Sequence, residues 1–80
     1  MLKLKIVSPE KILYDGEADI VKVPGVMGEF EILNNHAPIV SALQKGNVEY
    51  GLNGERSNFA IVGGFVEVLK NNVSLCVERE

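Results

Sequence analysis

The two side chains best suited to catalysis or metal binding each occur only once in this chain. His36 is the only histidine and Cys76 is the only cysteine. A metal site needs a cluster of three or four ligands, and neither residue has His, Cys or Asp ligands spaced around it. His36 lies in the turn-rich residues 34–38, where a lone histidine is typical of a structural or interface residue. Cys76 has apolar neighbours and is interpreted as a small residue packed in a strand.

Nucleophilic and acid–base catalysis have equally little support. No serine is surrounded by a nucleophile elbow, and neither of the common glycine-rich phosphate-binding motifs occurs. Glu29 and Glu31 share one face of a predicted strand, but acid–base work would need a pocket for which so short a chain has little volume. An acidic edge that faces solvent or a partner is the better interpretation. We therefore predict no catalytic residue, no metal and no cofactor.

Composition excludes further classes of function. The net charge is −3 and the eight basic residues are scattered, with Lys3 and Lys5 as the densest pair, whereas nucleic-acid binding needs a concentrated basic face. A single cysteine excludes an internal disulfide framework. The longest uncharged stretch, residues 32–44, is shorter than the roughly 20 apolar residues of a spanning helix. With no signal peptide at the N-terminus, we expect a cytoplasmic protein without direct membrane insertion.

The elements that must position these residues are predicted to be short strands. Leu2, Leu4 and Ile6 alternate with lysines, which is the pattern of a half-buried strand. Val and Ile are frequent, and no window shows helical spacing. Further strands are expected at residues 11–14, 17–23, 30–33, 39–43, 48–52, 59–62, 65–69 and 73–77. The segment 59–62 is expected to be buried on both faces, because all its residues are apolar.

Turn dipeptides separate these strands. Asp15-Gly16, Asn53-Gly54 and Asn71-Asn72 are expected to form tight turns, and Gly63-Gly64 a bend. Two-residue turns favour antiparallel pairing, because parallel pairs need long crossovers. The pattern predicts a single all-β domain over residues 1–80, either a sandwich or a closed barrel.

Several blocks then make the sequence specific. They are Ser8-Pro9-Glu10, the stretch from Pro24 to Gly28, the stretch from Ile32 to Pro38, Leu43-Gln44-Lys45-Gly46, and Gly63-Gly64-Phe65-Val66-Glu67-Val68. In this order, which spans nearly the whole chain, the sequence resembles the amino-terminal domain of the ε subunit of F-type ATP synthase. The resemblance implies an all-β fold, an antiparallel β-sandwich of about ten short strands in two packed sheets.

The resemblance also implies a non-catalytic rotor subunit with two partners. In the family, this domain binds the foot of the γ subunit and rests on the c ring of the membrane sector. It turns with both, so that proton-driven torque reaches the catalytic head. The implied location is peripheral, at the cytoplasmic face of the bacterial inner membrane, with no nucleic acid among the partners.

The match carries a small set of site residues over to this chain. The implied c-ring interface comprises Gly28, Glu29, Phe30 and Glu31. Glu29 would make a charge-assisted contact with the basic loops of the ring. The implied γ interface comprises Ser8, His36 and Pro38, and the strand positions add Val40 and Ala42.

The chain departs from the family pattern in three respects. Glu31 stands where members commonly have Gly, which adds a negative charge near the c-ring loop, and Asn34 stands where they have Pro. Most members continue into a helical hairpin that carries an inhibitory arm and, in some, a bound ATP, whereas this chain stops at Glu80. The alternative function is a small-ligand or regulatory binding module on the same sandwich, which would need a concave pocket with convergent polar groups.

Overall fold

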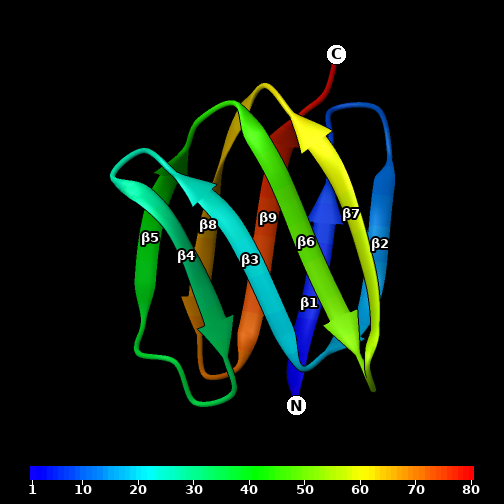
Figure 1. Cartoon of the computed structure of the whole chain (residues 1–80), viewed down its shortest axis with the longest axis vertical. Helices are drawn as coiled ribbons and strands as arrows, with labels where there is room; N and C mark the ends of the chain where they lie inside the picture. The colour runs from blue at the N-terminus through cyan, green and yellow to red at the C-terminus, as the bar shows by residue number, and fades with distance from the viewer.

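The computed structural model describes residues 1–80 as nine strands connected by turns (Figure 1). The strands are β1 (Leu2–Val7), β2 (Ile12–Ala18), β3 (Ile20–Gly25), β4 (Gly28–Leu33), β5 (Ile39–Leu43), β6 (Gly46–Leu52), β7 (Glu55–Ile61), β8 (Gly63–Leu69) and β9 (Asn72–Glu78). The structure contains no helix that is long and apolar enough to cross a membrane.

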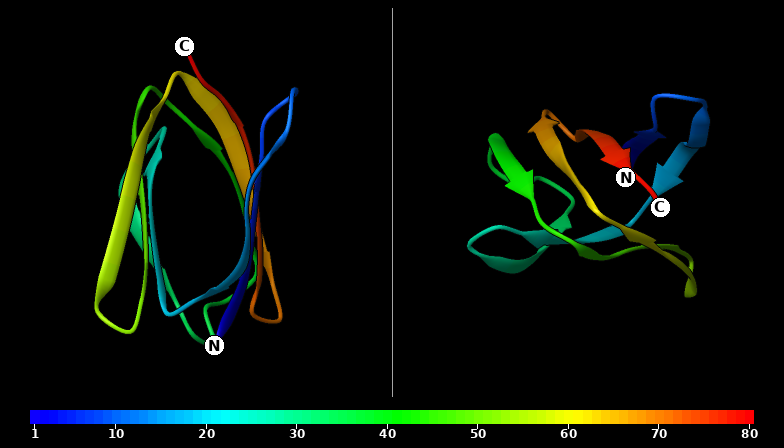
Figure 2. Two further views of the ribbon diagram at one scale, coloured as in Figure 1. Left: turned by 90° about the vertical axis from the view of Figure 1, so that its right-hand side faces the viewer. Right: turned by 90° about the horizontal axis from the view of Figure 1, so that it is seen from above.

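The strands form two layers that belong to one curled sheet. The hydrogen-bonded order is β2-β1-β9-β8-β5-β3-β6-β7, with β4 on the free side of β3. The layer of β4, β3, β6 and β7 lies in front of the layer of β5, β8, β9, β1 and β2, and Figure 2 shows the two from the side and from above. The all-β sandwich predicted from the sequence is confirmed, although it has nine strands and its two layers are continuous.

The continuity between layers depends on one short contact. Gly25 at the end of β3 pairs with Leu43 at the end of β5. Backbone hydrogen bonds from the amide of Val26 to the carbonyl of Ala42 (3.1 Å) and from Gln44 to Pro24 (2.8 Å) extend it. All pairings are antiparallel except that of β1 with β9, which joins the first strand to the last.

The core lies between the layers and follows from the alternation of the strands. The inward residues of β1 and β9 are buried, including Leu4, Ile6 and Leu75, while their neighbours face outward. Fifteen apolar residues form this core, and no polar or charged residue is buried in it. Full burial of each Val, Leu or Ile side chain contributes about 1.5–3 kcal/mol, so this alternation is the main sequence determinant of the fold.

Of the predicted turns, one is confirmed, one is displaced and one is wrong. Asn53 and Gly54 connect β6 to β7 with φ values of 54° and 85°, the backbone of a two-residue hairpin turn. The turn between β8 and β9 uses Lys70 and Asn71, one residue earlier than predicted, because Leu69 pairs with Asn72.

The predicted turn at Asp15-Gly16 is wrong. Both residues lie within β2, where Asp15 pairs with Lys5 and Gly16 with Leu4. The chain reverses earlier, where the amide of Ser8 donates to the carbonyl of Lys11 (2.9 Å). In β2, Gly16 leaves room for the side chain of Tyr14, because a Cβ at this position would lie 3.0 Å from the Tyr14 hydroxyl.

The expectation that residues 59–62 are buried on both faces is also wrong. Ile61 is buried, Phe59 is half-buried, and Ala60 and Val62 are exposed. The reason is that the fold has only two layers, so that the outer face of β7 has no third layer to cover it.

Candidate interaction surface

The outer face of the rear layer carries an apolar row where a solvated sheet face is normally polar. Residues paired across neighbouring strands point to the same side, so the register identifies the row. Ala42 pairs with Phe65, Phe65 with Cys76, Cys76 with Val7, and Val7 with Ile12. This apolar row therefore crosses five strands, β5, β8, β9, β1 and β2, at right angles to their direction.

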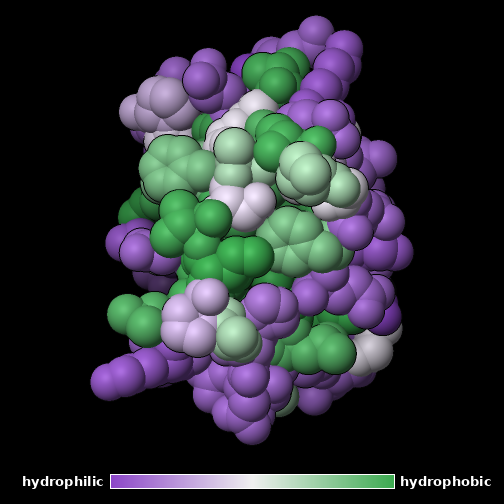
Figure 3. Space-filling view, turned by 90° about the vertical axis from the view of Figure 1, so that its left-hand side faces the viewer, coloured by the Kyte–Doolittle hydropathy of each residue, from purple (hydrophilic) through white to green (hydrophobic).

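Much of the apolar row is open to solvent. The exposed fractions are 51% for Phe65 and 57% for Ile12, and Ala42 is also exposed, while Val7 and Cys76 are half-buried. Beside it lies Val40 on β5, which is 72% exposed. Figure 3 faces the side of the molecule that carries β4 and β5, where the row begins, and apolar side chains gather there in a broad area. Contiguous exposed apolar surface of this kind marks interaction sites.

A shallow depression adjoins the apolar row at the end nearest the turn after β1. It has a volume of about 360 Å³, and its walls include Phe65, Cys76, Val77, Ser8 and Pro9. Its floor depends on Gly64, which has φ of 149° and whose backbone lies against β9. The depression gives the flat sheet face a concave end into which a partner side chain could insert.

Mostly polar residues border the apolar row on the side where Val40 lies. This register position begins with Val40 on β5 and continues with Glu67, Ser74, Lys5 and Asp15, in that order from β8 to β2. Lys5 and Asp15 pair directly, as do Lys3 and Glu17 one step further. Because these opposite charges face each other, this border is close to neutral, and the apolar row is the feature that distinguishes the face.

Three of the five residues predicted for the γ interface lie on or beside this surface. Ala42 belongs to the apolar row, Val40 adjoins it, and Ser8 lines the depression. The hydroxyl oxygen of Ser8 accepts a hydrogen bond from the amide of Lys11 (3.3 Å), which holds the turn in place.

The other two predicted residues lie in the loop between β4 and β5. Pro38 is exposed and directly precedes β5, on the same side of that strand as Val40 by its period of two. His36 is half-buried, and its amide donates to the carbonyl of Leu33 (3.1 Å). The loop is tied to the turn after β8, because the amide of Asn35 donates to the Oδ1 of Asn71 (2.7 Å).

The residues predicted for the c-ring interface begin β4, at the opposite face. Glu29 and Glu31 are exposed on the outer face of the front layer, where Lys22 of β3 pairs directly with Glu31 and Pro24 pairs with Glu29. The Nζ of Lys22 is 3.7 Å from the Oε1 of Glu29. Gly28 is exposed with φ of 127°, whereas Phe30 is half-buried and packs against the core.

Sequence reasoning missed several residues of this surface. Ile12 and Phe65 were predicted as strand residues and not as interface residues, Val7 was assigned to no element, and Cys76 was predicted as a packed residue. No local pattern could have singled them out, because they come from strands distant in the chain and meet only through the register. Met27, which is 96% exposed at the tip between β3 and β4, could have been noticed, since a tight turn rarely carries large apolar residues.

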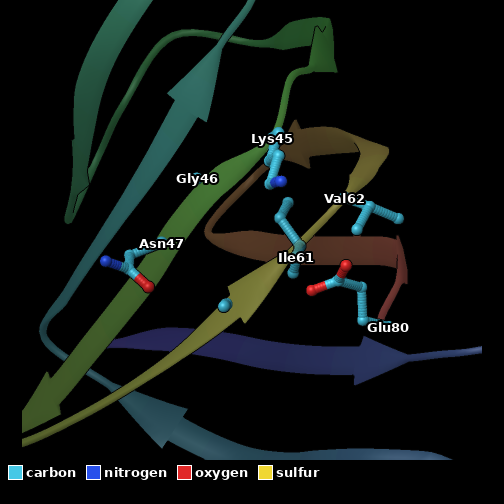
Figure 4. Close-up of a pocket in the computed structure, with 7 residues that line it drawn as sticks. Lys45, Gly46, Asn47, Ile61, Val62 and Glu80 are labelled. Atoms are coloured by element: carbon cyan, nitrogen blue, oxygen red, sulfur yellow. The ribbon is translucent and has the colours of Figure 1, made fainter.

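The remaining hollows bear on the alternative of a small-ligand module. One, shown in Figure 4, has a volume of about 150 Å³, and the side chains of Ile61 and Val62 lie between those of Lys45 and Glu80. Ligand pockets usually measure about 300–1,000 Å³ and bury most of their ligand. The hollow between β2 and β7 reaches about 300 Å³, but Tyr14, Tyr50 and Phe59 pack there to cover the seam of the sandwich.

Comparisons with known proteins agree with one another. The sequence profile of the ATP synthase delta/epsilon chain β-sandwich domain matches residues 1–79. The ATP synthase epsilon chain of Leptospira borgpetersenii is 46% identical over 78 residues, which cover 98% of this chain and 61% of that protein. The epsilon chain of Desulfosudis oleivorans is 41% identical, with 96% and 59% covered. The chain thus spans about three fifths of the length of these relatives.

Solved structures agree on the fold. A chain in the mitochondrial ATP synthase of Euglena gracilis matches with a TM-score of 0.90 at 22% identity, over 95% of this chain and 49% of that one. A chain in the central stalk and c-ring structure from Tetrahymena thermophila matches with a TM-score of 0.83 at 15% identity, over 96% and 63%. With the profile match over nearly every residue, the chain belongs to the family of ATP synthase delta/epsilon chain β-sandwich domains.

Proposed function

We propose that the chain acts as a non-catalytic central-stalk subunit of an F-type ATP synthase. It binds the γ subunit through the apolar row and the adjoining depression, and it contacts the c ring through residues 28–31. It rotates with both and couples proton translocation to ATP synthesis, at the cytoplasmic face of the bacterial inner membrane. The names of the curated relatives support this assignment.

The observation that carries the proposal is the apolar row itself. The exposure of Phe65, Ile12 and Val40 to water on an outer sheet face is unfavourable, and a protein that covers them would lower the free energy. The stiffness of the fold supports the same role. Both strands at the centre of the row, β8 and β9, are paired on both sides, so a torque applied to this face is resisted by ladders of hydrogen bonds.

A matched pair of variants on β8 tests the γ contact. Phe65 and Leu69 are each 51% exposed on the same face of this strand, but only Phe65 belongs to the apolar row. In a pull-down with recombinant γ, Phe65→Glu should weaken binding at least about 100-fold, because it removes an aromatic contact and buries a charge. Leu69→Glu should bind as the wild type does. Equal binding by the two variants would remove the apolar row from the γ contact.

The single cysteine supplies an independent readout. Cys76 lies in the middle of the apolar row and is half-buried, so alkylation with iodoacetamide can reach it in the free chain. In the complex with γ, the rate of alkylation should fall at least about tenfold, because a partner on the row excludes the reagent. An unchanged rate in a stable complex would mean that γ binds elsewhere.

A further inference from the structure

The sheet has two end strands that do not pair with each other, β2 and β7. β2 pairs only with β1, and β7 pairs only with β6. Figure 1 shows both end strands on the right-hand side of the molecule. An end strand presents unpaired amide and carbonyl groups, which can bind an extended strand of another chain. The free edge of β2, a strand of seven residues, is therefore a candidate site for strand addition.

The register identifies the backbone groups at this free edge. The amide of Lys3 donates to the carbonyl of Asn71 (2.8 Å), so Lys3 turns its backbone polar groups toward the β9 side and away from β2. In an antiparallel pair, the residue opposite Lys3 then turns its own groups away from β1. That residue is Glu17, and Asp15 is in the same phase because it pairs with Lys5. The amide and carbonyl groups of Asp15 and Glu17 therefore point to the free edge.

One of these groups already has a partner, the side chain of Tyr14. Its hydroxyl donates to the carbonyl of Glu17 at 2.7 Å. The side chain lies along β2 over Gly16, where a Cβ would be 3.0 Å from the hydroxyl oxygen. The ring also packs against Tyr50 of β6, with 4.6 Å between the ring centroids. Tyr14 is thus held across the seam between the layers, and an incoming amide would have to displace its hydroxyl or share the acceptor.

Charge indicates which strand of a second copy fits this edge. The outermost ionised side chains on the outer face of β2 are Asp15 and Glu17, each paired in the register with a lysine of β1. The β2 of another copy would place carboxylates directly opposite these two, which is destabilising. On the outer face of β7 the ionised side chain is Arg56, which contacts Glu49 of β6. Pairing of β2 with β7 would therefore give alternating charges across the joint.

We propose that the free edge of β2 is a self-association surface for β7 of a second copy, and that the hydroxyl of Tyr14 keeps this surface closed. Because the contact joins two different strands, every added copy leaves one β2 and one β7 free. The association therefore grows into open chains and does not stop at a closed dimer. The inference is independent of the proposed function, since it needs neither the γ subunit nor the c ring.

Matched variants of the two tyrosines test the closure. Tyr14→Phe removes only the hydroxyl, and the fraction of associated chains at a fixed high concentration should rise about three- to tenfold, the shift expected from one hydrogen bond. Tyr50→Phe keeps that hydrogen bond and should behave as the wild type does. Gly16→Ala displaces the side chain of Tyr14 and should associate as Tyr14→Phe does. Size-exclusion chromatography with light scattering measures the mass, and circular dichroism checks that each variant is folded.

Further variants separate the opening of the edge from a loss of stability. Asn71→Gly loses the hydrogen bond to the amide of Asn35, which lies away from the seam, and should remain as monomeric as the wild type. Arg56→Glu, added to Tyr14→Phe, should reverse the association. Lys22→Glu, which also removes a cation from an ion pair of the front layer, should not reverse it.

Three outcomes would overturn the inference. If Tyr14→Phe is as monomeric as the wild type, its hydroxyl does not keep the edge closed. If Asn71→Gly associates to the same extent, the association follows from lost stability. If Tyr14→Phe forms a closed dimer of fixed mass, the edge does not take β7 of a second copy.

Discussion

At the residue scale, the functional proposals depend on a few side chains whose surroundings are known. Phe65 is exposed and adds little to the core, so its replacement should affect binding rather than folding. Gly64 is different, because its backbone allows β8 to pass close to β9 beside the depression. A Cβ at this position would lie 2.2 Å from the carbonyl oxygen of Cys76. The shape of the candidate surface therefore depends on a residue with no side chain.

Gly64→Ala should destabilise the fold by about 3 kcal/mol, because φ of 149° is strained for any side chain and the new methyl group collides with backbone atoms. Gly63→Ala is the control, since its Cβ would meet only the carbonyl of Leu43 at 3.9 Å. It should change the stability by less than about 1 kcal/mol. Urea unfolding followed by circular dichroism measures both. Similar losses in the two variants would contradict the packing argument.

Glu29→Lys should leave the fold intact and weaken the coupling between ATP hydrolysis and proton pumping. The ion pair with Lys22 is exposed, so its loss should cost at most about 1 kcal/mol. The reversed charge would instead repel the basic loops of the proposed partner. ATP-driven proton uptake by membrane vesicles measures coupling, and Glu55→Lys, at the exposed first residue of β7, is the charge-matched control. Wild-type pumping by Glu29→Lys would remove Glu29 from the contact.

At the element scale, the turns determine which loops lie against each other. The turn after β8 places Asn71 with φ of 64°, and its side chain reaches the loop between β4 and β5. Its Oδ1 accepts the amide of Asn35, and its backbone carbonyl accepts the amide of Lys3 (2.8 Å). Three elements distant in sequence are therefore held together at one end of the sandwich, next to the predicted residues His36 and Pro38.

Two variants of Asn71 separate its side chain from its backbone. Asn71→Ala loses the hydrogen bond to Asn35 and strains the backbone, so it should cost about 2 kcal/mol in unfolding free energy. Asn71→Gly loses the same bond but accepts the positive φ, and should cost about 1 kcal/mol. In both, the amide of Asn35 should exchange its hydrogen faster. Unchanged exchange at that amide would show that the Asn71 side chain does not protect it.

At the scale of the whole molecule, we propose that residues 1–80 unfold as one cooperative unit. A single apolar core connects the layers, and the first strand pairs with the last. β9 lies between β8 and β1 and contributes Val73, Leu75 and Val77 to the core. Its removal would separate the rear layer into two parts and would remove Cys76, the centre of the apolar row.

Deletion of residues 72–80 should therefore abolish the cooperative thermal transition, because the loss of three core residues exceeds the usual stability of so small a fold. Deletion of residues 79–80 alone is the control. It removes the contact of Arg79 with the ring of Phe59, 5.4 Å from its centroid, and should cost less than about 1 kcal/mol. Thermal melting followed by circular dichroism compares the two, and a sharp transition in the larger deletion would contradict this prediction.

The sequence-based predictions were correct where neighbouring residues determine the structure, and wrong where contacts between distant parts of the chain determine it. Leu2, Leu4 and Ile6 were assigned correctly to an inward face. Their alternation with lysines can be read locally, and burial of the apolar face stabilises the strand. Asn53-Gly54 was also correct, since both residues suit a backbone of positive φ. Asp15-Gly16 was wrong, because the same residue types also fit a strand when a neighbouring strand pairs with them. Residues 59–62 were assigned to the wrong environment, because their composition does not show how many layers the fold has.

The sequence by itself determined the class of the fold, most strand positions and the resemblance to the ε subunit, since these depend on local alternation and on ordered motifs. The tertiary structure alone decided which outward side chains form a surface. Ala42, Phe65, Cys76 and Val7 lie far apart in the chain and become neighbours only through the register of four strands. A shift of one residue in that register would turn each side chain to the other face, so the apolar row is a property of the pairing.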